Sequence, residues 1–158
     1  MKHRIARLET PAIKNTTEIR VLYADTDAMA IVYHTNYIKW FEAGRNELLR
    51  SLGYPYTRLE DQGFLLPLTE CYCSFLTPAV YDDLLLIEAS LGELKAATIR
   101  LDYQIFRKST GELLAKGFTR HAVTDRKFKP VRLKSVAPDL YQIMTEKLDK
   151  QPEQEDQK

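Results

Sequence analysis

One long amphipathic helix is the feature of this sequence that most constrains its fold. Between residues 35 and 52 the apolar side chains recur every three or four positions and share one helix face: Tyr37, Trp40, Phe41, Gly44, Leu48 and Leu52. Thr35 or Asn36 is expected to cap the helix start, and Gly53 is a stop signal. Such a helix needs a second layer to cover its apolar stripe.

The segments around this helix are expected to form that second layer. In the segment 98–106, apolar side chains alternate with polar ones, which is the period of a half-buried strand: Ile99, Leu101, Tyr103 and Ile105. Further strands are predicted at residues 16–24, 65–76, 83–91 and 113–125. A hairpin turn is expected at 107–112, and short helices at 55–63 and 138–148.

The order of these elements predicts an α+β protein in which an antiparallel sheet of about five strands wraps around the one long helix. No linker divides the chain, so residues 16–148 are expected to form a single domain. Residues 1–15 are expected to be flexible, and the polar segment 149–158 is expected to be disordered. A small sheet leaves an edge strand, and such edges are often paired in a homodimer.

The composition limits the functions that are open to the chain. With a formal net charge of +1 over 158 residues, the chain is not expected to bind nucleic acid. No apolar run reaches the roughly 18 to 20 residues that span a bilayer, and the first residues lack the apolar core of a secretion signal. Cys71 and Cys73 are interpreted as reduced thiols. We therefore expect a cytoplasmic protein without a membrane span.

Two acids precede the helix. Asp25 and Asp27 stand before the run AIVYH, and Asp27 is too far from the helix to cap it locally. Either acid could be a solvated loop residue. However, the loop returns the chain to the helix N-terminus, where free N–H groups and a partial positive charge can stabilise an oxyanion. A carboxylate aimed at the same point could act as a nucleophile or activate water, which is the chemistry of acyl transfer.

The stretch Y-x-D-T-D-x-x-x-I-V-Y-H-x-x-Y-x-x-W-F-E-x-x-R, residues 23–45, resembles the signature of the hotdog-fold acyl-CoA thioesterases. It is most similar to the 4-hydroxybenzoyl-CoA thioesterase family and its YbgC-like branch. The segments FLTPAVYDDLLLIEA (75–89) and GFTRHAVTDRKFKPVRL (117–133) continue the resemblance, which covers residues 16–135. It implies a hotdog fold, assembly into homodimers or homotetramers, and an active site formed across the dimer interface.

The resemblance also implies roles for individual residues. The family's catalytic carboxylate, a nucleophile or general base, corresponds to Asp27, and its carbonyl-polarising backbone N–H corresponds to His34. Asp25 is the other candidate acid, with a loop-orienting role as its expected function. The family usually has glycine where this chain has Ala30, and glycine there would allow a positive φ. We therefore expect the loop around Ala30 to differ slightly from that of its relatives.

Further candidates keep two interpretations each. Tyr33 is either a substrate contact or part of the packing. The basic residues after the last strand form either a solvated turn or a binding site for the phosphates of coenzyme A: Arg126, Lys127, Lys129 and Arg132. His121 is expected to be a hydrogen-bonded strand residue, with a second catalytic role as its alternative. Glu42 and Arg45 are expected to form an ion pair on the helix surface.

The sequence thus predicts an acyl-CoA thioester hydrolase that releases free acid and coenzyme A. Two other functions remain open: a non-catalytic module that binds an acyl thioester or acyl carrier protein, and a hotdog dehydratase or hydratase. No phosphate-binding glycine motif and no metal-ligand spacing is present in the sequence, so we expect neither a metal nor a cofactor. Aromatic, short-chain and medium-chain acyl groups, carried by coenzyme A or by a carrier protein, are all compatible with these residues.

Overall fold

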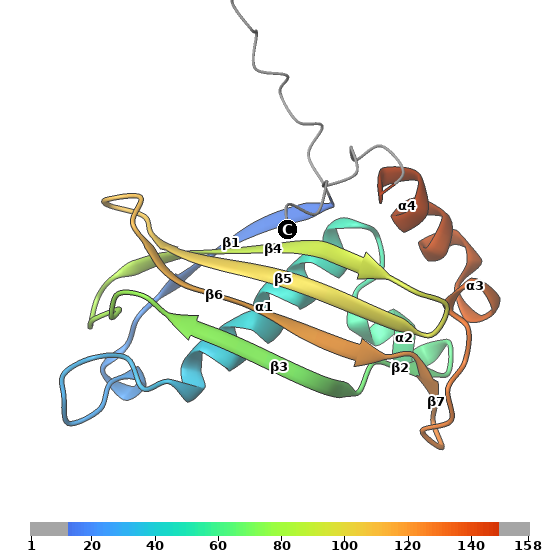
Figure 1. The fold of residues 1–158 in the computed structure, drawn as a ribbon, viewed down its shortest axis with the longest axis horizontal. Helices are drawn as coiled ribbons and strands as arrows, with labels where there is room; N and C mark the ends of the chain where they lie inside the picture. The colour runs from blue at the N-terminus through green and yellow to red at the C-terminus, as the bar shows by residue number, and fades with distance from the viewer. Residues whose placement is uncertain (1–12, 149–158) are drawn as a thin grey trace, which may run out of the picture.

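The computed structural model describes residues 13–148, which form a five-stranded antiparallel sheet around one long helix (Figure 1). The helix, α1, spans Thr35–Ser51 and lies against one face of the sheet. The strands follow the spatial order β1-β4-β5-β6-β3, with β1 at Lys14–Arg20, β3 at Leu68–Phe75, β4 at Leu84–Leu94, β5 at Thr98–Arg107 and β6 at Leu113–Ala122. The predicted α+β arrangement is therefore confirmed.

Smaller elements gather at one end of the sheet, beyond the C-terminal end of α1 (Figure 1). They are the helices α2 (Tyr56–Asp61), α3 (Leu133–Val136) and α4 (Pro138–Leu148), and the two-stranded sheet of β2 (Phe64–Leu65) and β7 (Thr124–Asp125). At the other end, a 3₁₀ turn, η1 (Tyr23–Asp25), leads into the loop before α1. The short helices expected at 55–63 and 138–148 are confirmed as α2 and α4.

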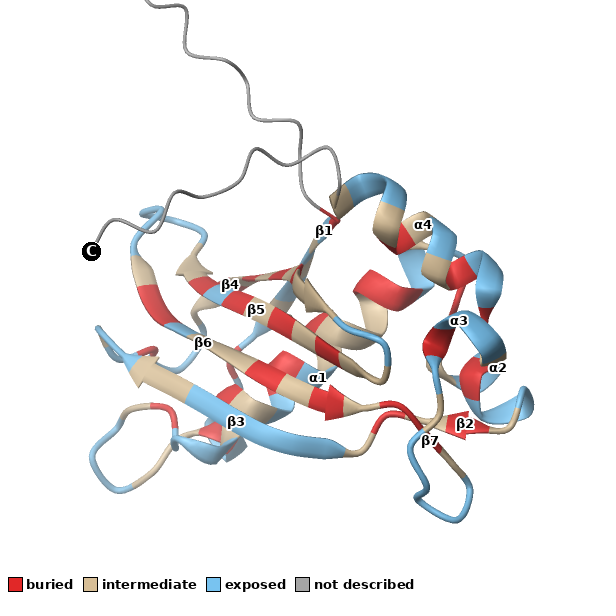
Figure 2. Ribbon diagram, turned by 45° about the vertical axis from the view of Figure 1, so that its right-hand side comes forward, coloured by how far each residue is buried: buried red, intermediate tan, exposed pale blue. Residues whose placement is uncertain are grey.

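The core lies between α1 and the sheet, as predicted from the helical spacing of the apolar residues in α1 and their two-residue alternation in β5. The predicted inward residues of β5 are all buried: Ile99, Leu101, Tyr103 and Ile105. Phe41 on α1 stacks on the Tyr103 ring, with centroids 4.3 Å apart. Gly44 lets the helix approach β4, because a Cβ at this position would lie 3.0 Å from Ile87. Figure 2 shows buried positions recurring along β4, β5 and β6, whereas β3 is mostly exposed.

Several boundaries differ from the prediction, for local reasons. The cap prediction is wrong, because the N-cap position is His34 and no side chain bonds the first helical N–H groups there. The long strand expected at 65–76 is divided at Pro67, which has no N–H to donate to a ladder. β1 begins at Lys14 and the preceding Ile13 is buried, so the ordered fold starts earlier than residue 16.

Other predictions fall partly outside the described part of the chain. The expected disorder at 149–158, and most of the expected flexible segment 1–15, lie outside residues 13–148. The turn at 107–112 is confirmed, with Gly111 at φ 72°. Gly53 ends α1 with φ 78°, as its stop signal predicted. No helix within residues 13–148 is long and apolar enough to cross a membrane.

The two edges of the sheet differ in chemistry. The β1 edge carries charges that pair with neighbouring strands, such as Lys14 with Glu88 at 2.9 Å. The β3 edge instead exposes large apolar side chains, with Leu68, Tyr72 and Phe75 each about half exposed at 50%, 52% and 53%. Natural proteins guard sheet edges with charge, proline or cover, so an apolar edge of this kind favours pairing with another chain.

Candidate functional site

The loop between η1 and α1 holds Asp27 in a tight turn. Thr26 and Val32 form an isolated antiparallel bridge, and within it the Asp27 N–H donates to the Ile31 carbonyl at 2.9 Å. Asp27 Oδ1 accepts the Met29 N–H at 2.8 Å, which fixes the side chain by a local turn. Among residues 13–148, Oδ2 of Asp27 has no hydrogen-bond partner, so one carboxylate oxygen is available to a ligand.

Asp25 is used differently, although it lies only two positions away. Its side chain is buried and its Oδ2 accepts the Leu22 N–H at 2.8 Å. Its backbone carbonyl accepts the Tyr33 N–H at 2.8 Å and the Asn36 side-chain amide at 2.9 Å. Asp25 therefore ties η1, the loop and the start of α1 together, and its contacts are those of a positioning residue.

The start of α1 presents unpaired backbone donors. The N–H groups of Asn36 and Tyr37 donate to the carbonyls of Tyr33 and His34 at 3.0 and 3.2 Å. The N–H groups of His34 and Thr35 have no acceptor among the described residues. Two free donors at a helix N-terminus, together with the helix dipole, stabilise a partial negative charge on an atom that accepts their hydrogen bonds.

Asp27 and His34 line one depression, which we call the Asp27 pocket. Its volume is about 290 Å³, and the other contributors come from the loop, α1 and the end of β3: Met29, Ile31, Val32, Tyr37, Phe75, Leu76, Thr77 and Pro78. The structure thus brings Asp27 and His34, the two predicted catalytic residues, to one pocket. Tyr33 is 46% exposed beside them, with its ring 4.4 Å from that of His34.

The loop geometry bears on the predicted difference at Ala30. Ala30 has φ 61°, in the left-handed region that costs a residue with a Cβ about 1–2 kcal/mol. Its N–H donates to the Asp27 carbonyl at 2.9 Å, and the Asp27 N–H pairs with the Ile31 carbonyl at 2.9 Å, so Ala30 occupies the left-handed position that closes such a short loop. The position therefore does require the positive φ that a glycine adopts freely, and alanine holds it under strain.

We expect Ala30→Gly to raise the free energy of unfolding by up to about 1 kcal/mol. Relief of the strain exceeds the added chain entropy of glycine, about 0.4–1 kcal/mol. Urea unfolding followed by circular dichroism measures this change. Ala28→Gly in the same loop is the matched control, because Ala28 is not at positive φ and should only lose stability. Equal losses in both variants would contradict the strain at Ala30.

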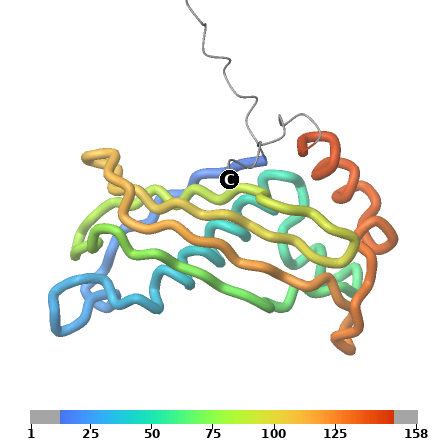
Figure 3. The backbone as a smooth tube through the Cα atoms, viewed as in Figure 1, coloured from blue at the N-terminus to red at the C-terminus, as the bar shows by residue number. Residues whose placement is uncertain are grey.

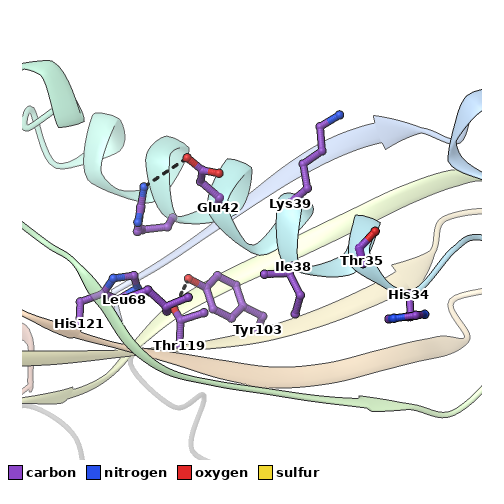
Figure 4. A pocket seen from close by; sticks show the side chains of 10 residues that line it. His34, Thr35, Ile38, Lys39, Glu42, Leu68, Tyr103, Thr119 and His121 are labelled. Atoms are coloured by element: carbon purple, nitrogen blue, oxygen red, sulfur yellow. Dashed lines mark hydrogen bonds and ion pairs between the residues drawn. The ribbon is translucent and has the colours of Figure 1, made fainter.

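A second and larger cavity adjoins the first at His34, and we call it the α1 groove (Figure 4). Its volume is about 550 Å³. Its lining comes from one flank of α1 and from strands β3, β5 and β6: His34, Thr35, Ile38, Lys39, Glu42, Arg45, Leu68, Tyr103, Thr119 and His121. Glu42 and Arg45 form the predicted ion pair at 3.8 Å, and Arg45 also bonds the Asn46 side chain.

A buried polar row forms part of the groove floor. Thr119 Oγ1 lies 2.8 Å from Tyr103 Oη and 2.9 Å from His121 Nε2, while His121 Nδ1 lies 3.0 Å from the Leu66 carbonyl. Burial lowers the pKa of His121 and raises the pKa of Tyr103 to about 12, so both side chains are neutral at pH 7. His121 is therefore a satisfied strand histidine, as predicted, but it also lines a cavity.

The neutral charge state fixes the direction of these hydrogen bonds. A carbonyl only accepts, so His121 Nδ1 carries the proton and Nε2 accepts from the Thr119 hydroxyl. Thr119 Oγ1 then accepts from the Tyr103 hydroxyl. Every donor in the row is used. From the sequence, Tyr103 was predicted only as a core residue. Its hydrogen bond to Thr119 depends on the register between β5 and β6, and the alternation of apolar and polar residues within one strand does not reveal that register.

The predicted basic residues lie elsewhere in the chain. Arg126, Lys127 and Lys129 gather in the turn after β7, where Asp125 Oδ1 accepts the N–H groups of both lysines. Arg132 stands apart at the start of α3. Figure 3 shows this turn and the loop before α1 at opposite ends of the sheet, so one chain does not bring the basic residues to Asp27.

Fold and site together define a hotdog protein in which Asp27 and His34, at the start of the central helix, line one pocket. The chain belongs to the thioesterase-like superfamily, whose sequence model matches residues 21–144.

Individual relatives agree with this assignment. The chain is 36% identical over 115 residues to the acyl-CoA thioesterase YbgC of Haemophilus influenzae, covering 72% of this chain and 83% of that protein. It is 29% identical over 120 residues to the 1,4-dihydroxy-2-naphthoyl-CoA hydrolase of a Synechocystis species, covering 73% and 87%. The solved DHNA-CoA thioesterase of Staphylococcus aureus superposes with a TM-score of 0.81 at 30% identity, covering 84% and 89% of the two chains.

Proposed function

We propose that this protein is an acyl-CoA thioester hydrolase, which releases a free acid and coenzyme A. The observation that carries the proposal is the Asp27 pocket, where Asp27, with one carboxylate oxygen unpaired among the described residues, shares one depression with His34 at the start of α1. Membership of the thioesterase-like superfamily supports the thioester as the bond that is broken. The names of the relatives support coenzyme A as the carrier of the acyl group.

In the proposed reaction, the thioester carbonyl oxygen accepts hydrogen bonds from the N–H groups of His34 and Thr35. As a nucleophile attacks the carbonyl carbon, negative charge builds on that oxygen, and the helix N-terminus stabilises it. Asp27 either activates a water by taking its proton or attacks directly and forms an anhydride that water then cleaves. In both routes water supplies the hydroxyl of the acid, and the sulfur leaves as a thiol or thiolate.

The other two functions require features that the site supplies less well. A dehydratase or hydratase needs a histidine ring and an acid for proton transfer to and from carbon. In this chain His34 and Asp27 would have to serve as that pair, because both ring nitrogens of His121 are hydrogen-bonded within the fold. A binding module would not require a free carboxylate oxygen beside free N–H groups, so hydrolysis is the function we favour.

The apolar β3 edge supports a homodimer as the working form. In a dimer with a two-fold axis, the β3 strands of the two subunits would pair antiparallel. The β7 turn of each subunit would then lie at the same end of the dimer as the partner's loop before α1, because these two segments are at opposite ends of one sheet. The partner's Arg126, the partner's Lys127 and the partner's Lys129 would then approach the loop that holds Asp27. We propose that they bind the phosphates of coenzyme A, since basic side chains pair well with phosphate.

We expect Tyr72→Lys to yield a monomer of 18.3 kDa, because it places a charge in the centre of the apolar β3 edge. Its thioesterase activity should fall with the dimer, by at least tenfold. Light scattering and thiol release on the same samples measure both effects. Thr16→Lys on the exposed face of β1 is the matched control and should remain dimeric and active. A dimeric Tyr72→Lys would show that β3 is not the paired edge.

Thiol release from a panel of acyl-CoA esters, followed with a chromogenic disulfide reagent, tests the function itself. We expect turnover of at least one ester class. Parallel assays with acyl groups on carrier protein decide which carrier is preferred. No release from any thioester by a folded dimer would refute hydrolysis and leave the binding module as the function to test.

A further inference from the structure

The α1 groove is long as well as apolar. Its α1 residues lie on one helix flank, from His34 at the helix start to Arg45 three turns later. At 1.5 Å per residue these two positions are about 16 Å apart along the helix axis. Figure 4 shows Ile38 directed toward the floor between them, whereas Lys39 and Glu42 point away from it. The groove therefore leads from the start of α1 along the helix, between α1 and the strands.

The polar row is at the far end of this path. Tyr103 stacks on Phe41 and lies beneath Gly44, so it faces the third turn of α1. Seven to ten residues separate His34 from these two positions, which corresponds to about 10–15 Å along the helix. A single aromatic ring attached to a carbonyl held at His34 is too short to reach Tyr103.

At the end of the groove formed by the polar row, no hydrogen-bond donor of that row is left to bind a charged or strongly polar end of an acyl chain. Each donor of the polar row already has an acceptor, so an apolar chain end can rest against it without leaving a buried donor unpaired. The Arg45 guanidinium bonds the Asn46 side chain at 3.0 Å, faces Glu42 at 3.8 Å and lies over the Tyr56 ring at 4.8 Å. A carboxylate at the end of the acyl group would have to compete with these contacts.

We propose that the α1 groove binds a medium-length aliphatic acyl chain, with Ile38 along its wall and the row of Tyr103, Thr119 and His121 as its end. This inference rests on the proposed hydrolysis and specifies its substrate class. An extended chain advances about 1.2 Å per bond, by analogy with extended backbone, so the groove accommodates about eight to twelve carbons. Ile38 and Tyr103 are specificity-determining residues in this arrangement, because they bound the space and take no part in the chemistry.

The test is the dependence of kcat/KM on chain length for straight-chain acyl-CoA esters of two to sixteen carbons, with benzoyl-CoA included. Each buried methylene should raise kcat/KM about threefold to fourfold. The rise should end between eight and twelve carbons, and benzoyl-CoA should be a poorer substrate than decanoyl-CoA. A flat profile, or an optimum at two to four carbons or at benzoyl-CoA, would overturn the proposed chain length while leaving thioester hydrolysis intact.

Ile38→Trp should move the optimum, because the added ring fills the groove one turn beyond the start of α1. We expect the best substrate to shorten to about four to six carbons, and the ratio of decanoyl to butanoyl turnover to fall at least tenfold. Arg50→Trp adds the same ring to an exposed part of α1 outside the groove and should keep the wild-type profile. An unshifted optimum in folded Ile38→Trp would overturn the inference.

Binding separates this inference from the function on which it rests. If no thioester is hydrolysed, calorimetric titration with decanoyl-CoA and butanoyl-CoA still measures the preference of the groove. Tighter binding of decanoyl-CoA by wild type, lost in Ile38→Trp, would support the acyl groove in a protein that does not hydrolyse. Equal affinity for the two esters would refute it. If Ile38→Trp does not fold, the dependence of the wild-type kcat/KM on acyl chain length decides by itself whether the groove binds a medium-length chain.

Discussion

Asp27→Asn is expected to lower kcat for thioester hydrolysis by roughly three orders of magnitude, with little change in KM. The amide can neither take a proton from water nor attack the carbonyl as a carboxylate does. The N–H groups at the start of α1 remain, so binding of the ester and polarisation of its carbonyl should persist. Steady-state thiol release and titration with a substrate measure the two properties separately.

The substitution should leave the fold intact, which makes the loss of activity interpretable. The Asp27 contact within the turn is made by Oδ1, which accepts the Met29 N–H, and an asparagine oxygen can accept the same bond. Thermal unfolding should therefore be close to that of wild type. Asp82→Asn makes the same chemical change at an exposed residue with φ 68°, a conformation that asparagine tolerates, and should keep full activity.

Two outcomes would contradict this assignment. Unchanged kcat in folded Asp27→Asn would remove Asp27 from the chemistry. Loss of turnover in Asp25→Asn with stability unchanged would transfer the catalytic role to Asp25. We expect Asp25→Asn to act mainly through stability, because the Asp25 carboxylate holds the Leu22 N–H in a buried setting.

Gly117→Ala is expected to destabilise the protein by about 3–5 kcal/mol, a large share of the stability of a typical domain. A Cβ at Gly117 would overlap the Tyr72 carbonyl oxygen and would lie 3.0 Å from the Phe41 ring. The first contact is with the backbone of the neighbouring strand, which cannot move without breaking the β3–β6 ladder. The second displaces the ring that stacks on Tyr103.

Urea unfolding followed by circular dichroism measures this loss. Gly111→Ala is the matched control, since a Cβ there has nothing within 4 Å and only its φ of 72° opposes it. It should cost about 1–2 kcal/mol. If Gly117→Ala is as stable as Gly111→Ala, then β3, β6 and α1 are not as closely packed as the structure has them. A soluble but weakened variant should also lose the groove, whose floor includes Tyr103.

Local periodicity was sufficient to predict the helix and the sheet. The α1 stripe and the alternation in β5 are repeated signals, because a face that must be buried imposes the same residue type every three to four or every two positions. Boundaries were less well predicted where a single residue decides them. Pro67 divides one expected strand, and the helix start lacks the side-chain cap that Thr35 or Asn36 was expected to provide.

The candidate site was predicted only in part. Asp27 and His34 lie in one short segment, so their resemblance to a family motif was enough to pair them, and the pocket they share agrees with that pairing. Tyr103 and Thr119 were not recognised as a cavity floor. They belong to different strands, and strand register depends on the whole sheet.

The sequence by itself determined the layers of this protein, the acids before its helix and the unusual alanine at position 30, because each is a local pattern of residue types. Only the tertiary structure decided that Ala30 is held at positive φ, that the basic turn lies at the far end of the sheet from Asp27, and that a groove runs along α1. These features depend on contacts between segments distant in the chain, and packing of the sheet around α1 sets those contacts.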